Sequence, residues 1–200
     1  MHPPFRIIIC GLQDLHHHVD ANITHVLSIL DPSFPAPQVF EEYGAHTKLE
    51  LRFDDIIEER KSLVAPTQED VKAALAFGRE MMAAPTARLL VHCHAGISRS
   101  SACLSLLMAQ AMPESPAEDL FQEVLRIRPQ IWPNLRIVEF GDALLGRGGT
   151  MVEAAKRVYA RQLRREPDLE EDMRFCKRDR EVEAGLALNG LTAPARGARR

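Results

Sequence analysis

The sequence predicts an α/β fold with a mainly parallel central sheet of four to five strands flanked by helices. Up to Leu145, short apolar runs rich in β-branched residues alternate with longer segments of helical periodicity. This order is typical of a parallel sheet with helices on its faces. The chain has 200 residues, of which 46% are hydrophobic and 26% charged. Such a composition is that of a globular protein with enough chain for a sizeable core.

Four segments have the character of strands, namely residues 5–10, 23–30, 48–53 and 89–91. Segment 23–30 is apolar, ends at Asp31-Pro32, and is expected to be a central strand. Segment 48–53 alternates in strand fashion, with its apolar residues on one face. These segments supply the predicted sheet.

Helices are expected between and after the strands, over residues 12–20, 68–81, 100–108, 116–127, 135–145 and 151–163. Thr67 is the predicted N-cap of helix 68–81, with Asp70 closing a capping box. Ser115 is the predicted N-cap of helix 116–127, with Pro116 in the first helical position and Glu118 closing the box. Segment 100–108 is apolar on most sides, which indicates a helix buried nearly all round.

A loop of small residues joins strand 89–91 to helix 100–108, and it contains Cys93, Gly96 and Arg99. A strand, a tight loop and a helix N-terminus direct unpaired N–H groups and the helix dipole at one point, which binds oxyanions. The same field favours a cysteine thiolate over the thiol. The planar guanidinium of Arg99 is suited to hold two phosphate oxygens at once. The pattern therefore predicts a phosphatase with a cysteine nucleophile.

The string His-Cys-x-x-Gly-x-x-Arg-Ser at residues 92–100 resembles the signature of the protein tyrosine phosphatase superfamily. Residues 95–100, Ala-Gly-Ile-Ser-Arg-Ser, are most similar to the dual-specificity branch. Arg128, Pro133 and Asn134 also match a stretch that precedes the last core helix of that family. The resemblance implies the cysteine-phosphatase fold, with a phosphate-binding loop between a strand and a helix.

The resemblance also implies roles for individual residues. Cys93 is expected to attack phosphorus, and Arg99 to hold the equatorial oxygens together with the peptide N–H groups of the loop. The phosphate-binding residues are His94, Ala95, Gly96, Ile97, Ser98 and Arg99. His92 is expected to fix the Cys93 backbone, and Ser100 to donate its hydroxyl to the thiolate. The reaction is expected to need neither a cofactor nor a metal.

The mechanism requires a general acid that protonates the leaving group and then activates water. Asp54 and Asp55 are paired carboxylates at the end of strand 48–53. Strand alternation places Asp55, rather than Asp54, on the face of Leu51 and Phe53, towards the edge where active sites of parallel sheets open. The family comparison agrees, so Asp55 is the predicted acid and Asp54 the alternative.

The expected partner is a phosphorylated protein or a small phosphoester, with phosphotyrosine as the first substrate and phosphoserine or phosphothreonine as further ones. Phosphoinositide phosphatases of the superfamily that this loop resembles typically carry a Lys inside it, and this loop has none, so the resemblance argues against a lipid head group. Two alternatives are a non-catalytic phosphate-binding adaptor on the same fold and a phosphatase of a non-protein phosphoester. A metal-dependent hydrolase using His92 and His94 is a remote third. The histidine run 16–18 is a poor metal site because consecutive helical residues point apart.

Composition and cysteine usage bear on partners and compartment. The net charge is −3 and no basic patch dominates the first 150 residues, so neither nucleic acid nor a membrane is an expected partner. Cysteines occur at positions 10, 93, 103 and 176 without paired spacing, and the first apolar run is too short for a signal peptide. We therefore expect reduced thiols and a cytoplasmic location.

The composition changes after Gly149. Residues 1–148 are interpreted as the catalytic domain. Residues 149–200 are interpreted as a charged, partly helical C-terminal extension with a disordered end from residue 189. The extension is expected to pack on the core, to contact a partner or a second copy, or to remain a solvated appendage.

Overall fold

The computed structural model describes residues 3–84 and 86–190, and its centre is a four-stranded sheet. The strands are β1 (Arg6–Cys10), β2 (His25–Leu30), β3 (Thr47–Arg52) and β4 (Arg88–His92). They lie in the order β1-β4-β2-β3, and all neighbours pair in parallel. The predicted α/β class and the four predicted strands are confirmed, and segment 23–30 does supply a central strand.

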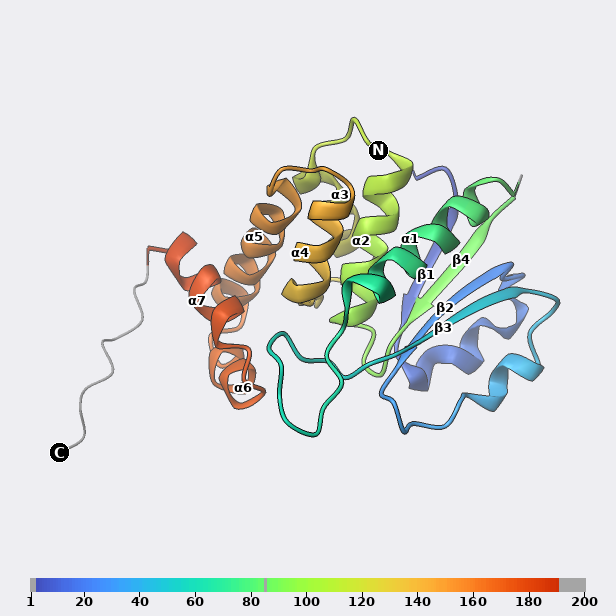
Figure 1. Ribbon diagram of the computed structural model, residues 1–200, viewed down its shortest axis with the longest axis horizontal. Coiled ribbons are helices and arrows are strands. Elements are labelled where there is room, and N and C mark those ends of the chain that lie inside the picture. Colours follow the sequence, from blue (N-terminus) through green and yellow to red (C-terminus); the bar gives the residue numbers. More distant parts are fainter. Residues whose placement is uncertain (1–2, 85, 191–200) are drawn as a thin grey trace.

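Side chains alternate along the strands and enter two cores on opposite faces of the sheet. Leu27 and Val91 belong to the larger core, which is covered by α1 (Gln68–Met82) and α2 (Arg99–Ala111). Val26 and Leu90 belong to a smaller core covered by η1 (Leu12–Ala21) and η2 (Gln38–Glu41). Figure 1 shows the two groups of helices on the two sides of the sheet. The helix expected at 12–20 is present as a 3₁₀ helix.

The two predicted capping boxes have different outcomes. At α1, the Thr67 hydroxyl accepts from the Asp70 N–H at 3.3 Å, and the Asp70 carboxylate accepts from the Thr67 N–H at 2.8 Å. The box predicted for α3 (Ala117–Ile127) is wrong, because Pro116 is itself the N-cap and makes no capping hydrogen bond with its side chain. Ser115 then precedes the cap, and Glu118 is one position too early to close a box; it pairs with Arg157 instead.

Helix α2 is buried on all sides over residues 99–109, as its composition predicts. Two of its polar side chains donate hydrogen bonds to backbone carbonyls of the same helix or of the loop before it. The Ser101 hydroxyl donates to the carbonyls of Ile97 and Ser98, and the Ser105 hydroxyl donates to the Ser101 carbonyl at 2.9 Å. Within the described ranges, no helix is both long enough and apolar enough to cross a bilayer.

Four further helices follow: α4 (Leu135–Leu144), α5 (Thr150–Arg165), α6 (Leu169–Phe175) and α7 (Asp179–Leu188). Helix α5 lies beside α4, and α7 lies on the far side of α5 (Figure 1). The apolar residues of α5 and α7 share the larger core with the sheet; among them are Met151, Ala155, Val158, Tyr159, Val182 and Leu186. Of the alternatives for the extension, packing on the core is what the structure shows up to α7. Residues 191–200, most of the expected disordered end, lie outside the described residues.

Candidate active site

Cys93 follows directly on the last residue of β4, and α2 begins at Arg99, so the loop between them spans the carboxyl end of a central strand. The Cys93 side chain is buried, at 2% exposure. Its Sγ lies 3.2 Å from the Oγ of Ser100, in the first turn of α2. The structure thus places the thiol beside the hydroxyl predicted to assist it, at a helix N-terminus.

The loop's carbonyl groups are bound from outside by the surrounding elements. The His94 carbonyl accepts from the backbone N–H of Leu12 at 2.9 Å, and the Ala95 carbonyl accepts from the Arg128 guanidinium at 2.9 Å. The Ile97 carbonyl accepts from the backbone N–H of Trp132 at 3.1 Å, and the Ser98 carbonyl accepts from that of Asn134 at 3.3 Å. The C=O and N–H of a planar trans peptide point in opposite directions. The outward carbonyls therefore turn loop N–H groups to the inner side, where an oxyanion can accept from them.

Gly96, in the middle of this loop, meets two separate requirements. Its φ of +69° lies in the left-handed region that side chains disfavour. A Cβ built on it would also lie 2.4 Å from the backbone of Cys10. The loop therefore needs glycine here both for its turn and for its close approach to β1.

The guanidinium of Arg99 is 3% exposed and only partly satisfied by protein groups. Its Nη1 donates to Asp31 Oδ1 at 2.6 Å and to the Phe53 carbonyl at 2.7 Å. Its Nε is buried and has no hydrogen-bond partner among residues 3–84 and 86–190. A buried N–H without an acceptor is costly, and an oxyanion beside Cys93 would supply one.

The two candidate acids have different surroundings. Asp54 turns away and accepts the Val64 N–H at 2.7 Å. Asp55 faces the loop, and its Oδ1 accepts from Ser98 Oγ at 2.8 Å, Asn134 Nδ2 at 2.9 Å and Arg178 Nη1 at 3.1 Å. Burial alone would raise the pKa of Asp55, but the positive charges of Arg178 and Arg99 hold it below the usual value.

The two histidines that flank Cys93 are held as neutral rings. His92 is fully buried, with Nδ1 in a long contact of 3.4 Å with the Cys93 carbonyl, and burial lowers its pKa to about 4. Burial also lowers the pKa of His94, whose Nε2 accepts the Asp31 N–H at 3.2 Å. The half-exposed ring of Phe34 lies edge-on to His94, with 4.6 Å between centroids.

Sequence reasoning missed three charged residues of this site. Asp31 follows β2 directly, and its place at the carboxyl end of a parallel strand is a signal that could have identified it. Arg178 and Glu181 belong to the extension, among many charges of both signs, and no local pattern distinguishes them. They reach the site only through the packing of α7.

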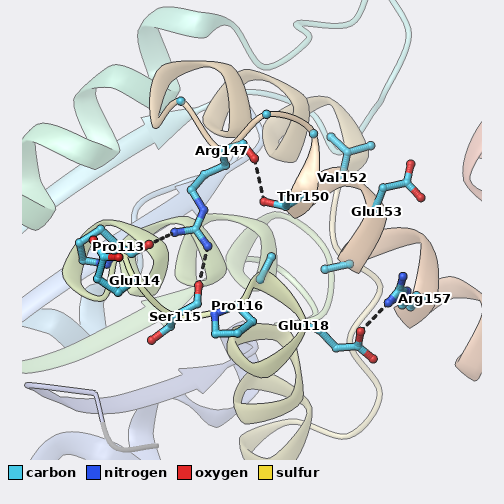
Figure 2. Close-up of a pocket in the computed structure, with 15 residues that line it drawn as sticks. Pro113, Glu114, Ser115, Pro116, Glu118, Arg147, Thr150, Val152, Glu153 and Arg157 are labelled. Carbon is cyan, nitrogen blue, oxygen red and sulfur yellow. Dashed lines mark hydrogen bonds and ion pairs between the residues drawn. The ribbon is translucent and has the colours of Figure 1, made fainter.

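One hollow of the molecule lies apart from Cys93. The hollow in Figure 2 is lined by the N-terminal ends of α3 and α5, and the Arg147 guanidinium there donates to the carbonyls of Pro113 and Ser115. In the part of the chain that the structure describes, no group of three or more His, Cys, Asp or Glu side chains is placed to hold a metal ion.

The sequence matches no protein-family model and no curated protein. Similar solved structures include human DUSP28, at 18% identity and a TM-score of 0.54, covering 70% of this chain and 94% of that one. The human tyrosine phosphatase-like serine/threonine/tyrosine-interacting protein has 20% identity and a TM-score of 0.55, covering 71% and 92%. The Cydia pomonella PTP-2 phosphatase has 20% identity and a TM-score of 0.55, covering 69% and 84%. The chain therefore has the fold of the dual-specificity phosphatases, as the resemblance at residues 92–100 predicts.

Proposed function

We propose that this protein is a cysteine-dependent phosphatase that hydrolyses phosphate monoesters of proteins, with phosphotyrosine as its principal substrate. One observation carries the proposal. The Cys93 thiol lies at a helix N-terminus inside a loop with outward carbonyls, and that loop leads into Arg99, whose buried Nε–H has no partner among the described residues. This combination of nucleophile and oxyanion donors is suited to phosphoryl transfer.

In the proposed first step, the Cys93 thiolate attacks phosphorus and forms an S–P bond while the P–O bond to the leaving group breaks. Asp55 gives its proton to the departing oxygen. In the second step Asp55 takes a proton from water, and the resulting nucleophile breaks the S–P bond and releases inorganic phosphate. Ser100, 3.2 Å from Sγ, stabilises the thiolate as it leaves. Each cycle consumes one water and restores both groups.

Two further observations support an aryl phosphate of a protein as substrate. The half-exposed Phe34 ring beside His94 offers an apolar contact for a phenyl group at the rim of the loop. The loop has no Lys to pair with the additional phosphates of a lipid head group. The similar structures include proteins named as phosphatases, in agreement with the proposal.

The decisive experiment compares turnover of phenyl phosphate and a phosphotyrosine peptide by the protein and its variants. Cys93→Ser is expected to abolish turnover, because a serine hydroxyl is not ionised in this field. Arg99→Lys is expected to reduce it by about 10²-fold or more, since an ammonium cannot replace the planar fork. Cys176→Ser, at an exposed cysteine, is the matched control and is expected to retain full activity.

Three outcomes would contradict the proposal, and inhibition by vanadate would support it. Undiminished turnover by Cys93→Ser would refute the proposal. Binding of the phosphotyrosine peptide without any turnover would indicate an adaptor. Vanadate, a phosphate analogue, is expected to compete with substrate. Loss of activity on treatment with a chelator would instead indicate a metal-dependent hydrolase.

A further inference from the structure

A buried arginine from the C-terminal extension reaches the proposed catalytic groups. Arg178 is the N-cap residue of α7, and its side chain is 5% exposed. Its Nη1 donates to Asp55 Oδ1 at 3.1 Å, and its Nη2 donates to Ser98 Oγ at 3.1 Å. One guanidinium thus joins the acid-bearing loop after β3 to the phosphate-binding loop before α2.

The position of this guanidinium is fixed from the opposite side by Glu181. The Glu181 carboxylate is fully buried and accepts from Arg178 Nε at 2.7 Å and Nη2 at 2.8 Å. It also accepts from the Trp132 indole at 2.6 Å and the Leu135 N–H at 2.8 Å. Burial alone would lower the pKa of Arg178, but Glu181 and Asp55 raise it, so the guanidinium remains charged.

We infer that Arg178 is a positioning residue of the active site, which orients Asp55 for proton transfer and binds Ser98 of the phosphate-binding loop. The inference rests on the proposed function. Arg178, Ser98 and Asn134 all donate to Oδ1 of Asp55. Their convergence on one oxygen fixes the plane of the carboxylate and leaves Oδ2 as the oxygen that carries the proton.

Arg178 also sets the pH at which Asp55 can act as an acid. The charged or titratable groups that act on Asp55 are Arg178 from α7, Arg99 from α2 and His94 from the loop, with Glu181 behind Arg178. Asn134 and Ser98 contribute neutral donors. Because a cation near a carboxylate favours its ionised form, removal of Arg178 keeps Asp55 protonated to higher pH.

The test measures kcat/KM against pH for phenyl phosphate, whose leaving group needs protonation, and for p-nitrophenyl phosphate, whose leaving group needs little. With Arg178→Met, the basic limb for phenyl phosphate is expected to move up by about one to three pH units. Arg180→Met is the matched control, since Arg180 lies on the same helix but pairs with Glu58 and Glu139 at the surface. It is expected to leave the limb in place.

Arg178→Lys keeps a charge near Asp55 but cannot serve Asp55, Ser98 and Glu181 together. It is expected to lower kcat/KM for phenyl phosphate by about tenfold to a hundredfold while changing that for p-nitrophenyl phosphate much less. If Arg178→Met fails to fold, the kinetics of Arg178→Lys with the two substrates test the inference. An equal loss with both substrates, or an unmoved limb in a folded Arg178→Met protein, would reduce Arg178 to a structural contact and overturn the inference.

A second measurement separates this inference from the proposed function. The ¹³C shift of the Asp55 carboxyl, assigned with Asp55→Asn, is titrated in the unsubstituted protein and in Arg178→Met. An upward move of the Asp55 titration in Arg178→Met is expected, and it needs no turnover to be seen. An unchanged titration refutes the coupling. A shifted titration in a protein without phosphatase activity refutes the proposed function, and with it a catalytic role for the coupling.

Discussion

Asp54 and Asp55 are adjacent in the chain, yet their carboxylates bind different partners. Asp55→Asn is expected to slow turnover of phenyl phosphate by about 10²–10⁴-fold, the usual contribution of a general acid. It is expected to slow p-nitrophenyl phosphate far less, because that leaving group departs without a proton. Asp54→Asn removes a charge but keeps a side-chain oxygen that can accept from the Val64 N–H, and it is expected to show no such contrast between substrates.

Steady-state kinetics with the two substrates is the measurement for this pair of variants. If Asp54→Asn showed the dependence on leaving group and Asp55→Asn did not, the assignment of the acid would be wrong by one residue. A similar loss for both substrates in Asp55→Asn would point to damage of the loop, since the Asp55 carboxylate also accepts from Ser98.

His92 makes a prediction about stability against pH. Burial lowers its pKa to about 4 in the folded protein, while an unfolded chain binds the proton near the ordinary value. Between those two values the unfolded state binds more protons, so stability falls as the pH falls. From pH 7 to pH 5, the His92 contribution to the free energy of unfolding is expected to drop by about 2 kcal/mol.

Urea unfolding at pH 7 and pH 5, with His92→Gln as the comparison, isolates this contribution from other titrating groups. The unsubstituted protein should lose more stability than His92→Gln over that interval. Equal losses in the two proteins would show that His92 is not the neutral buried ring described here.

The two helix starts at α1 and α3 allow a direct comparison at the scale of elements. Thr67→Ala removes a hydroxyl that caps α1 and is expected to cost about 1 kcal/mol of stability. Ser115→Ala is the matched control, because Ser115 precedes Pro116, the N-cap of α3. It is expected to change stability by less than about 0.5 kcal/mol. Chemical denaturation that found equal costs would contradict the corrected helix start.

Local signals were sufficient for most elements of this fold. The strands follow from apolar runs, α1 from its capping box, and the phosphate-binding loop from a string of nine neighbouring residues, 92–100. The start of α3 was misplaced by one residue because a proline is acceptable both at the N-cap and in the first turn, and the sequence does not distinguish these.

The part of the site that was missed depends on contacts between distant segments. Asp31 lies 68 residues from its partner Arg99, and Arg178 lies 123 residues from Asp55. Periodicity and spacing describe neighbours along the chain, so they carry no information on such pairs. Asp55 lies three residues beyond the last residue of β3, where strand alternation no longer fixes the face of a side chain, so its role as the acid stays a prediction. Arg178 could not be predicted, because the packing of α7 decides where its guanidinium lies.

At the scale of the whole molecule, α7 belongs to the same core as the sheet, so we expect one cooperative unfolding transition. Leu186→Ala truncates a buried side chain of α7 and is expected to lower the free energy of unfolding of the whole chain by about 2–5 kcal/mol. Leu188→Ala makes the same chemical change two residues away, at a side chain that is 49% exposed, and is expected to cost much less.

Calorimetry and urea unfolding followed by two probes check this expectation. A separate early transition in Leu186→Ala, with the sheet unaffected, would show that the extension unfolds independently. Coincident transitions would show that the stability of the phosphate-binding loop and that of α7 cannot be changed separately.

The distance along the chain between Asp55 and Arg178 has a consequence for the order of events during synthesis. A ribosome that has translated as far as α2 has already made Cys93, Arg99 and Asp55, whereas Arg178 is added only after α3, α4, α5 and α6 have been made. If Arg178 has the role inferred for it, the growing chain carries the nucleophile Cys93 well before the acid Asp55 is oriented. Competence to cleave unactivated esters is then acquired late, when α7 closes on the rest of the protein.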